Sequence, residues 1–161
     1  MINFYKMYNR DGLDNESYGV LIDRLQSGQY TKEMISIEHI IKTHSWYSFY
    51  YARGVLNRRW FEAEPYIMKN TCTAYEYARD VIRGRFIEAE PYIIKNPFYS
   101  YMYAKTILHS RWLEAEQYIM KDSYSAYLYA IDVIRDRWEE AEDKIYTHSA
   151  YWGVYSKRFG I

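Results

Sequence analysis

The chain lacks a second cysteine, a long hydrophobic run and a net charge. Its single cysteine, Cys72, excludes an internal disulfide and is typical of a reducing compartment. No run approaches the roughly 18 consecutive apolar residues of a membrane-spanning helix, and the N-terminus shows no signal-peptide pattern, so we expect a cytoplasmic protein without a membrane contact. The 21 basic residues are balanced by 21 acidic ones, which removes the usual electrostatic argument for nucleic-acid binding.

Residues that could carry chemistry are also few. A helical metal site needs histidines three or four positions apart, and no pair has that spacing among His39, His44, His109 and His148. The sequence has no glycine-rich phosphate loop and no nucleophile elbow. Cys72 stands at the start of a predicted helix, where a thiol can be acidified, but no paired base is visible and a core role explains it more simply. We therefore predict that the chain is not an enzyme and has no cofactor, metal or catalytic residue.

The residue in excess is tyrosine, with 21 copies, and its spacing reveals a repeat of 26 residues. Blocks 60–85 and 112–137 agree at 17 of 26 positions, and block 86–111 agrees with the first at 12, without a gap. Stacking of such blocks predicts a single helical-repeat domain over residues 1–161. Around the three clear repeats the sequence predicts a divergent N-terminal cap at 1–33, a degenerate repeat at 34–59 and a truncated C-terminal repeat at 138–161.

Each repeat predicts two short helices. The longer one, helix A, has an N-cap residue before it and a glycine or polar residue after it. The N-caps are Asn70, Asn96 (followed by Pro97) and Asp122, and the breaks are Gly84, Ser110 and Asp136. The shorter one, helix B, carries an apolar stripe at Trp60, Ala63 and Ile67. Pro65 and Pro91 require helix B either to begin late or to kink, and both readings stay open. Two further helices are predicted at about 16–27 and 32–43.

Two recurring features predict the core. Tyr51, Tyr77, Tyr103, Tyr129 and Tyr155 share one position, and we expect a column of buried rings beside small residues, with hydroxyl groups that reach polar partners. The motif Arg-aromatic-x-Glu-Ala-Glu recurs as well, and its second glutamate is predicted to be half-buried and to need a partner charge. The recurring arginines Arg59, Arg85, Arg111 and Arg137 are the expected partners. Because the two glutamates of a motif lie about 200° apart on a helix, they do not form an acid–base pair.

The outward side of helix A differs from repeat to repeat and changes from mixed charge to Met, Leu and Ile toward the C-terminus. Exposed apolar residues gathered on one side often mark a contact surface. The candidate protein-binding residues on this side are Tyr50, Arg53, Glu76, Arg79, Arg83, Met102, Lys105, His109, Leu128, Ile131 and Arg135. The same pattern also fits a solvated face, or a face covered by residues 16–43 or by a second chain.

The sequence R-[WF]-x-E-A-E-x-x-I followed by A-x-x-Y-A-x-x-[VI] is carried by Arg59–Ile67 with Tyr77–Val81 and by their 26-residue images. It resembles the short tandem helical repeats of uncharacterised bacteriophage and other viral proteins, over about residues 34–156. The resemblance implies a helical-repeat architecture and supplies no active site. It also implies a small protein that acts on a host factor in the host cytoplasm.

Together these observations predict an all-α fold, an α-solenoid of short helix-turn-helix repeats with about ten helices. The predicted function is to bind another protein, as an adaptor or an inhibitor of a host (defence) protein. The alternative is a single-stranded nucleic-acid-binding module that stacks bases on tyrosine and arginine, with Arg79, Arg83 and Lys105 on the phosphates. Self-association is a further option, through an aromatic C-terminal end made of Tyr151, Trp152, Tyr155 and Phe159.

Overall fold

The computed structural model describes residues 8–9, 12–13 and 41–161, and the chain divides into two compact units, Met1–Lys69 and Asn70–Ile161. The predicted helix at 16–27, most of the one at 32–43 and nearly all of the N-terminal cap lie outside the described residues, although residues 41–43 are helical. The prediction of a single domain therefore stays a prediction.

The described residues of the first unit include a short strand pair and two helices that pack together. Strands β1 (Tyr8–Asn9) and β2 (Gly12–Leu13) pair antiparallel. Helix α3 (Ser45–Tyr51) continues into the π-helical segment η2 (Ala52–Leu56), and α4 (Glu64–Ile67) packs against α3. The ring centroids of Tyr51, at the end of α3, and Trp60, before α4, lie 4.9 Å apart, so an aromatic contact joins the two segments.

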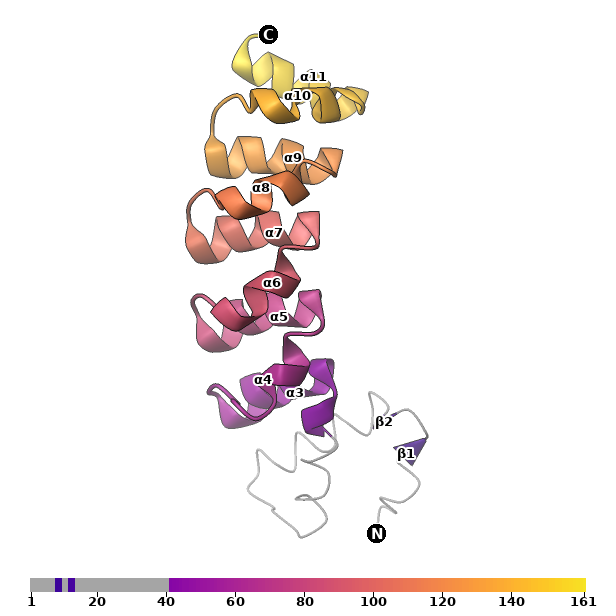
Figure 1. The fold of residues 1–161 in the computed structure, drawn as a ribbon, viewed down its shortest axis with the longest axis vertical. Helices are drawn as coiled ribbons and strands as arrows, with labels where there is room; N and C mark the ends of the chain where they lie inside the picture. The colour runs from indigo at the N-terminus through magenta and orange to yellow at the C-terminus, as the bar shows by residue number, and fades with distance from the viewer. Residues whose placement is uncertain (1–7, 10–11, 14–40) are drawn as a thin grey trace. The chain divides into compact units, whose positions relative to one another are not determined.

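The second unit is a stack of helical repeats (Figure 1). Its longer helices each run into a π-helical segment, except the last: α5 (Thr71–Tyr77) with η3 (Ala78–Ile82), α7 (Pro97–Tyr103) with η5 (Ala104–Leu108), α9 (Ser123–Tyr129) with η6 (Ala130–Ile134), and α11 (Ser149–Phe159). Its shorter helices are α6 (Glu90–Ile93), preceded by the 3₁₀ turn η4 (Ile87–Ala89), α8 (Leu113–Ile119) and α10 (Glu139–Tyr146). Each longer helix packs on the next, and the shorter helices pack beside them. The predicted all-α repeat architecture is confirmed.

The starts of the longer helices follow the sequence prediction. The side chain of Asn70 accepts a hydrogen bond from the amide of Thr73 at 3.1 Å, and Asn96 does the same for Tyr99. Asp122 accepts from the amide of Ser125 at 2.8 Å. Each cap satisfies an amide that has no partner within the helix, so the N-cap predictions are confirmed.

The ends of these helices differ in detail from the prediction. The residue with left-handed backbone is Arg83, His109 or Arg135, one position before the predicted breaks at Gly84, Ser110 and Asp136. Each helix closes with a π turn, in which the amides of both Arg83 and Gly84 bond to the carbonyl of Ala78. Because the π turn ends the helix early, a bulky residue and not the glycine adopts the strained conformation.

The two prolines act by delaying the start of helix B. In α4 and α6, Pro65 and Pro91 occupy the first turn, and both helices begin only one residue earlier. In α8 the same position holds Gln117, and this helix begins at Leu113. Proline tolerates a first turn because its missing amide would have no partner there, so no kink is needed.

The recurring tyrosine is buried as predicted, and its ring pairs with the aromatic side chain nine positions later. The ring of Tyr103 lies 5.1 Å from that of Trp112, nine positions later. Its hydroxyl accepts a hydrogen bond from the amide of Phe86 at 2.7 Å and donates to Glu90 at 3.0 Å. Tyr129 and Tyr155 repeat both hydroxyl contacts one and two repeats later. The predicted polar partners of the phenols are therefore confirmed, and burial raises the pKa of the Tyr155 phenol to about 12.

Candidate functional site

The Arg-aromatic-x-Glu-Ala-Glu motif forms an ion-pair ladder. In every repeat the arginine donates two hydrogen bonds to the carboxylate five positions later, at 2.7–2.9 Å, for Arg59–Glu64, Arg85–Glu90, Arg111–Glu116 and Arg137–Glu142. The other glutamate of each motif is exposed. The arginine is thus the partner of the second glutamate, as predicted, and the ion pair ties the residue before helix B to its first turns.

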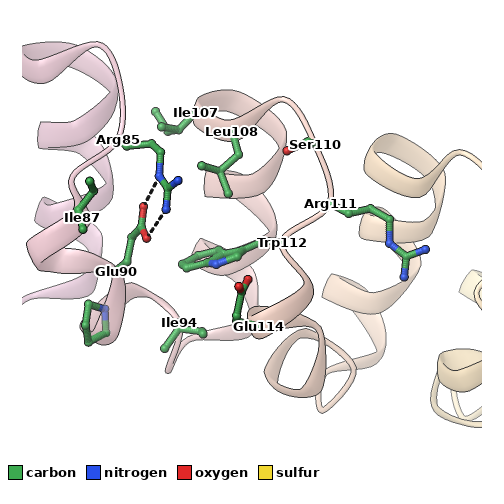
Figure 2. A pocket seen from close by; sticks show the side chains of 11 residues that line it. Arg85, Ile87, Glu90, Ile94, Ile107, Leu108, Ser110, Arg111, Trp112 and Glu114 are labelled. Atoms are coloured by element: carbon green, nitrogen blue, oxygen red, sulfur yellow. Dashed lines mark hydrogen bonds and ion pairs between the residues drawn. The ribbon is translucent and has the colours of Figure 1, made fainter.

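A hollow of about 660 Å³ opens between α6 and the following repeat, and we call it the helix-B hollow. Figure 2 shows the Arg85–Glu90 pair on one side and Leu108 with the indole of Trp112 on the other. Its remaining lining residues are Ile87, Pro91, Ile94, Ile107, Ser110, Arg111 and Glu114. Both lining arginines are already paired, Arg85 with Glu90 and Arg111 with Glu116. An aliphatic and indole surface beside paired arginines suits an apolar side chain better than a charged one.

Exposed apolar side chains stand at one fixed position beside helix B. Ile87 is 63% exposed and Leu113 is 66% exposed, and Phe61 is similarly exposed at the same repeat position in the first unit. The last repeat has Glu139 there. The sequence prediction missed this position because it considered only the variable side of helix A. The signal was visible in the sequence, since a position off the buried stripe stayed apolar in three successive repeats.

Four of the predicted residues come together on the side of helix A. Lys105, His109, Ile131 and Arg135 line a second hollow of about 480 Å³, which we call the helix-A hollow. Its other lining residues are Ala104, Ser110, Asp132, Val133 and Arg158. They come from η5, η6 and α11, so three consecutive repeats of the second unit contribute to it.

Asp132 organises the charges of the helix-A hollow. Its carboxylate accepts a hydrogen bond from the ammonium of Lys105 at 2.8 Å and another from the hydroxyl of Tyr101. Burial opposes ionisation of Asp132, but these hydrogen bonds and the charges of Lys105 and Arg158 hold its pKa below the ordinary value. The hydrogen bond to Asp132 in turn raises the pKa of Lys105. Both groups therefore stay charged at neutral pH.

The other predicted residues are spread along helix A. Arg79 forms an ion pair with Asp80, with its Nε at 2.6 Å from the carboxylate, and Arg83 is exposed. Glu76 is half-buried, and its Oε2 atom has no hydrogen-bond partner in the part of the chain that the structure describes. In the first unit Tyr50 is half-buried and Arg53 is exposed. The apolar members Met102, Leu128 and Ile131 are half-buried, so the apolar part of the predicted stripe offers less free surface than expected.

The aromatic C-terminal end is engaged within its own unit. Tyr155 is fully buried, and its ring lies 4.9 Å from Phe159 and 5.7 Å from Trp152. Tyr151 stacks on Tyr127 at 5.5 Å. Self-association through this end stays a prediction.

Comparison with known proteins gives no match to a protein-family model, to a curated protein or to a solved structure. Among the described residues, no three or more His, Cys, Asp and Glu side chains lie close enough to hold a metal ion. The helices that the structure describes include none with the length and apolar character needed to cross a membrane. The resemblance to viral repeats and the absence of an enzymatic activity remain predictions.

Proposed function

We propose that the chain is a non-enzymatic repeat scaffold that binds another protein. The observation that carries this proposal is the pair of apolar side chains, Ile87 and Leu113, that stay exposed at the same position of successive repeats. Ile87 also lines the helix-B hollow. Folding does not require an apolar residue there, since the last repeat has Glu139. Apolar side chains kept in solvent at a recurring position are typical of a contact surface.

The frame around this surface supports binding without a large rearrangement. Glu90 is held by Arg85 and by the hydroxyl of Tyr103, so the charged side of the hollow is already organised. An apolar side chain of a partner would enter against Leu108 and Trp112 and would leave these pairs intact. Such preorganisation lowers the entropic cost of association.

A narrower role is an adaptor or inhibitor of a host protein. It derives from the resemblance of the repeats to those of viral proteins, and it would use the same surface. Identification of the captured protein would test this narrower role.

The test is affinity capture from cells that express the chain, followed by mass spectrometry. The double variant Ile87→Glu, Leu113→Glu copies the residue found at position 139, so we expect unchanged helical content and loss of capture by tenfold or more, since each buried anchor contributes about 1.5–3 kcal/mol. The matched control is Glu88→Gln, Glu140→Gln, at exposed positions that do not line the helix-B hollow. Equal capture by wild type and the Ile87/Leu113 variant would contradict the proposal.

Single-stranded nucleic-acid binding is the alternative, and one observation favours it. Phe98 and Tyr124 are partly exposed, and their rings are nearly parallel, with 7° between the planes and 6.4 Å between centroids. Such rings can stack on bases. This alternative predicts salt-sensitive retention of a labelled oligothymidylate, and it fails without retention at low salt.

A further inference from the structure

The helix-A hollow concentrates positive charge in a chain whose net charge is zero. Three of its lining residues are cationic, Lys105, Arg135 and Arg158, and the one carboxylate among its lining residues is Asp132. Asp132 is already bonded to Lys105 and to Tyr101. Two guanidinium groups therefore remain as a local surplus of charge.

These two arginines have no carboxylate within ion-pair distance among the described residues. Arg135 uses its Nε to bond the backbone carbonyl of Asp132 at 3.3 Å. Arg158 lies with its guanidinium carbon 5.9 Å from the ring centroid of Phe159. Both side chains are exposed. A guanidinium with free N–H groups presents a fork that matches a carboxylate or a phosphate.

The position of Arg135 is fixed by the fold. Its backbone is left-handed, with φ of 62°, and its amide bonds to the carbonyl of Ala130 at 2.7 Å. Arg158 comes from α11 of the next repeat, and its charge also acts on Asp132. The guanidinium groups of Arg135 and Arg158 therefore come from successive repeats.

Most exposed acidic groups of the second unit stand on other elements, and Asp136, which follows Arg135, accepts a hydrogen bond from the amide of Arg137. Glu88, Glu114 and Glu140, together with Glu139, lie at the starts of the short helices. The excess of positive charge at the helix-A hollow is therefore local, and the zero net charge of the chain does not reveal it. Such a surface attracts an anionic ligand and steers its approach.

The lining favours an acidic peptide over a nucleic acid. A single strand needs aromatic rings close to the cations that hold its phosphates. The exposed ring of Phe98 stands at the start of α7, whereas His109 follows it by 11 residues, about 16 Å along a helix. The apolar lining of the hollow includes the aliphatic Ile131 and Val133, and the ring next to Arg158, that of Phe159, is half-buried and not part of the lining. Carboxylates next to aliphatic side chains match that combination.

We infer that the helix-A hollow binds an acidic segment of the protein partner, with Arg135 and Arg158 each receiving a carboxylate. This inference rests on the proposed function and names the chemistry of the partner. It also gives a role to His109 and Ile131, which line the same hollow and carry no part of the ion-pair ladder.

The test uses the full chain and a fluorescent oligoglutamate peptide, with binding followed by fluorescence anisotropy at low salt. We expect salt-sensitive binding that weakens about tenfold in the double variant Arg135→Gln, Arg158→Gln. The matched control Lys95→Gln, Lys121→Gln removes the same charge from exposed positions outside the hollow and should bind as wild type does. Circular dichroism of each variant reports whether it is folded.

Three outcomes would overturn the inference. The first is no binding of oligoglutamate at low salt. The second is an equal loss in both double variants, since that would mean unspecific attraction. The third is tighter binding of oligothymidylate than of oligoglutamate, lost in the Arg135/Arg158 variant, which would assign the hollow to nucleic acid. The Ile87/Leu113 variant separates this inference from the proposed function, because it should lose partner capture and keep oligoglutamate binding.

Discussion

At the scale of a single residue, the hydroxyl of the recurring tyrosine connects a backbone amide, a glutamate and, through that glutamate, an arginine. In Tyr129 it accepts from the amide of Trp112 and donates to Glu116, which Arg111 also holds. The amide of Trp112 begins a turn and has no carbonyl partner within its own helix. One phenol therefore satisfies a buried amide and orients the carboxylate of the ion pair.

Removal of this hydroxyl should be costly. We expect Tyr129→Phe to lower the free energy of unfolding by about 1–3 kcal/mol, because the amide of Trp112 then loses its buried partner. Tyr124→Phe is the control, since its ring is partly exposed, and we expect a change within about 0.5 kcal/mol. The measurement is urea unfolding followed by circular dichroism. Equal stabilities of the two variants would show that the buried phenol is not needed.

The ion-pair ladder predicts a sensitivity to acid. The hydrogen bonds from Arg137, with a further one from Tyr155, hold the pKa of Glu142 below its ordinary value of 4.5. A carboxyl group with a lowered pKa in the folded state stabilises the fold above its unfolded pKa, and this contribution is lost as the pH falls through the folded pKa. We expect Glu142→Gln to be less stable than wild type at neutral pH and the gap to close well below pH 4.5. A gap that stays constant down to that range would contradict the assignment.

At the scale of the helices, the sequence predicted starts better than ends. An Asn or Asp N-cap acts through its own side chain, so Asn70, Asn96 and Asp122 were readable directly. No single residue type in the sequence indicates the π turn at each helix end, because this turn depends on how Ala78 and its equivalents pack. The left-handed residue consequently fell on Arg83 and not on Gly84. The sequence left two options for α6, a late start or a kink, since Pro91 is compatible with both, and the structure has the late start.

The helix ends can be tested by substitution of glycine. No atom lies within 4 Å of a Cβ placed on Gly84, and its φ is not positive, so we expect Gly84→Ala to raise the free energy of unfolding by about 0.4–1 kcal/mol. Gly160 has a φ of 72°, so we expect Gly160→Ala to lower the free energy of unfolding by up to about 1 kcal/mol. Thermal unfolding of both variants gives the answer. A destabilising Gly84→Ala would place the left-handed residue at position 84.

At the scale of the whole unit, Asn70–Ile161 owes its stacked architecture to contacts that recur one repeat later. Tyr75 reaches Thr106 and Tyr101 reaches Asp132, each 31 positions ahead, and Tyr127 stacks on Tyr151. Tyr75, Tyr101 and Tyr127 share one repeat position, and α11 has Gly153 at that position. The last helix therefore has no tyrosine there that could contact a following repeat. The period made the stacking predictable from sequence alone, because short helices need neighbours to supply their core. The helix-B hollow was not predictable in the same way, since it depends on how far successive repeats are spaced.

Removal of one whole repeat should leave a folded protein. Deletion of residues 86–111 joins Arg85 to Trp112, so Arg85 would pair with Glu116, Tyr77 would pack on Trp112 and Tyr75 would reach Asp132. We expect a cooperative unfolding transition with unchanged helical content per residue and a smaller m value, because less surface is exposed on unfolding. Deletion of residues 86–98 is the control, and it should abolish cooperative unfolding because it removes Glu90 and breaks the register. Loss of cooperativity in both deletions would mean that the second unit is held together by contacts that do not repeat.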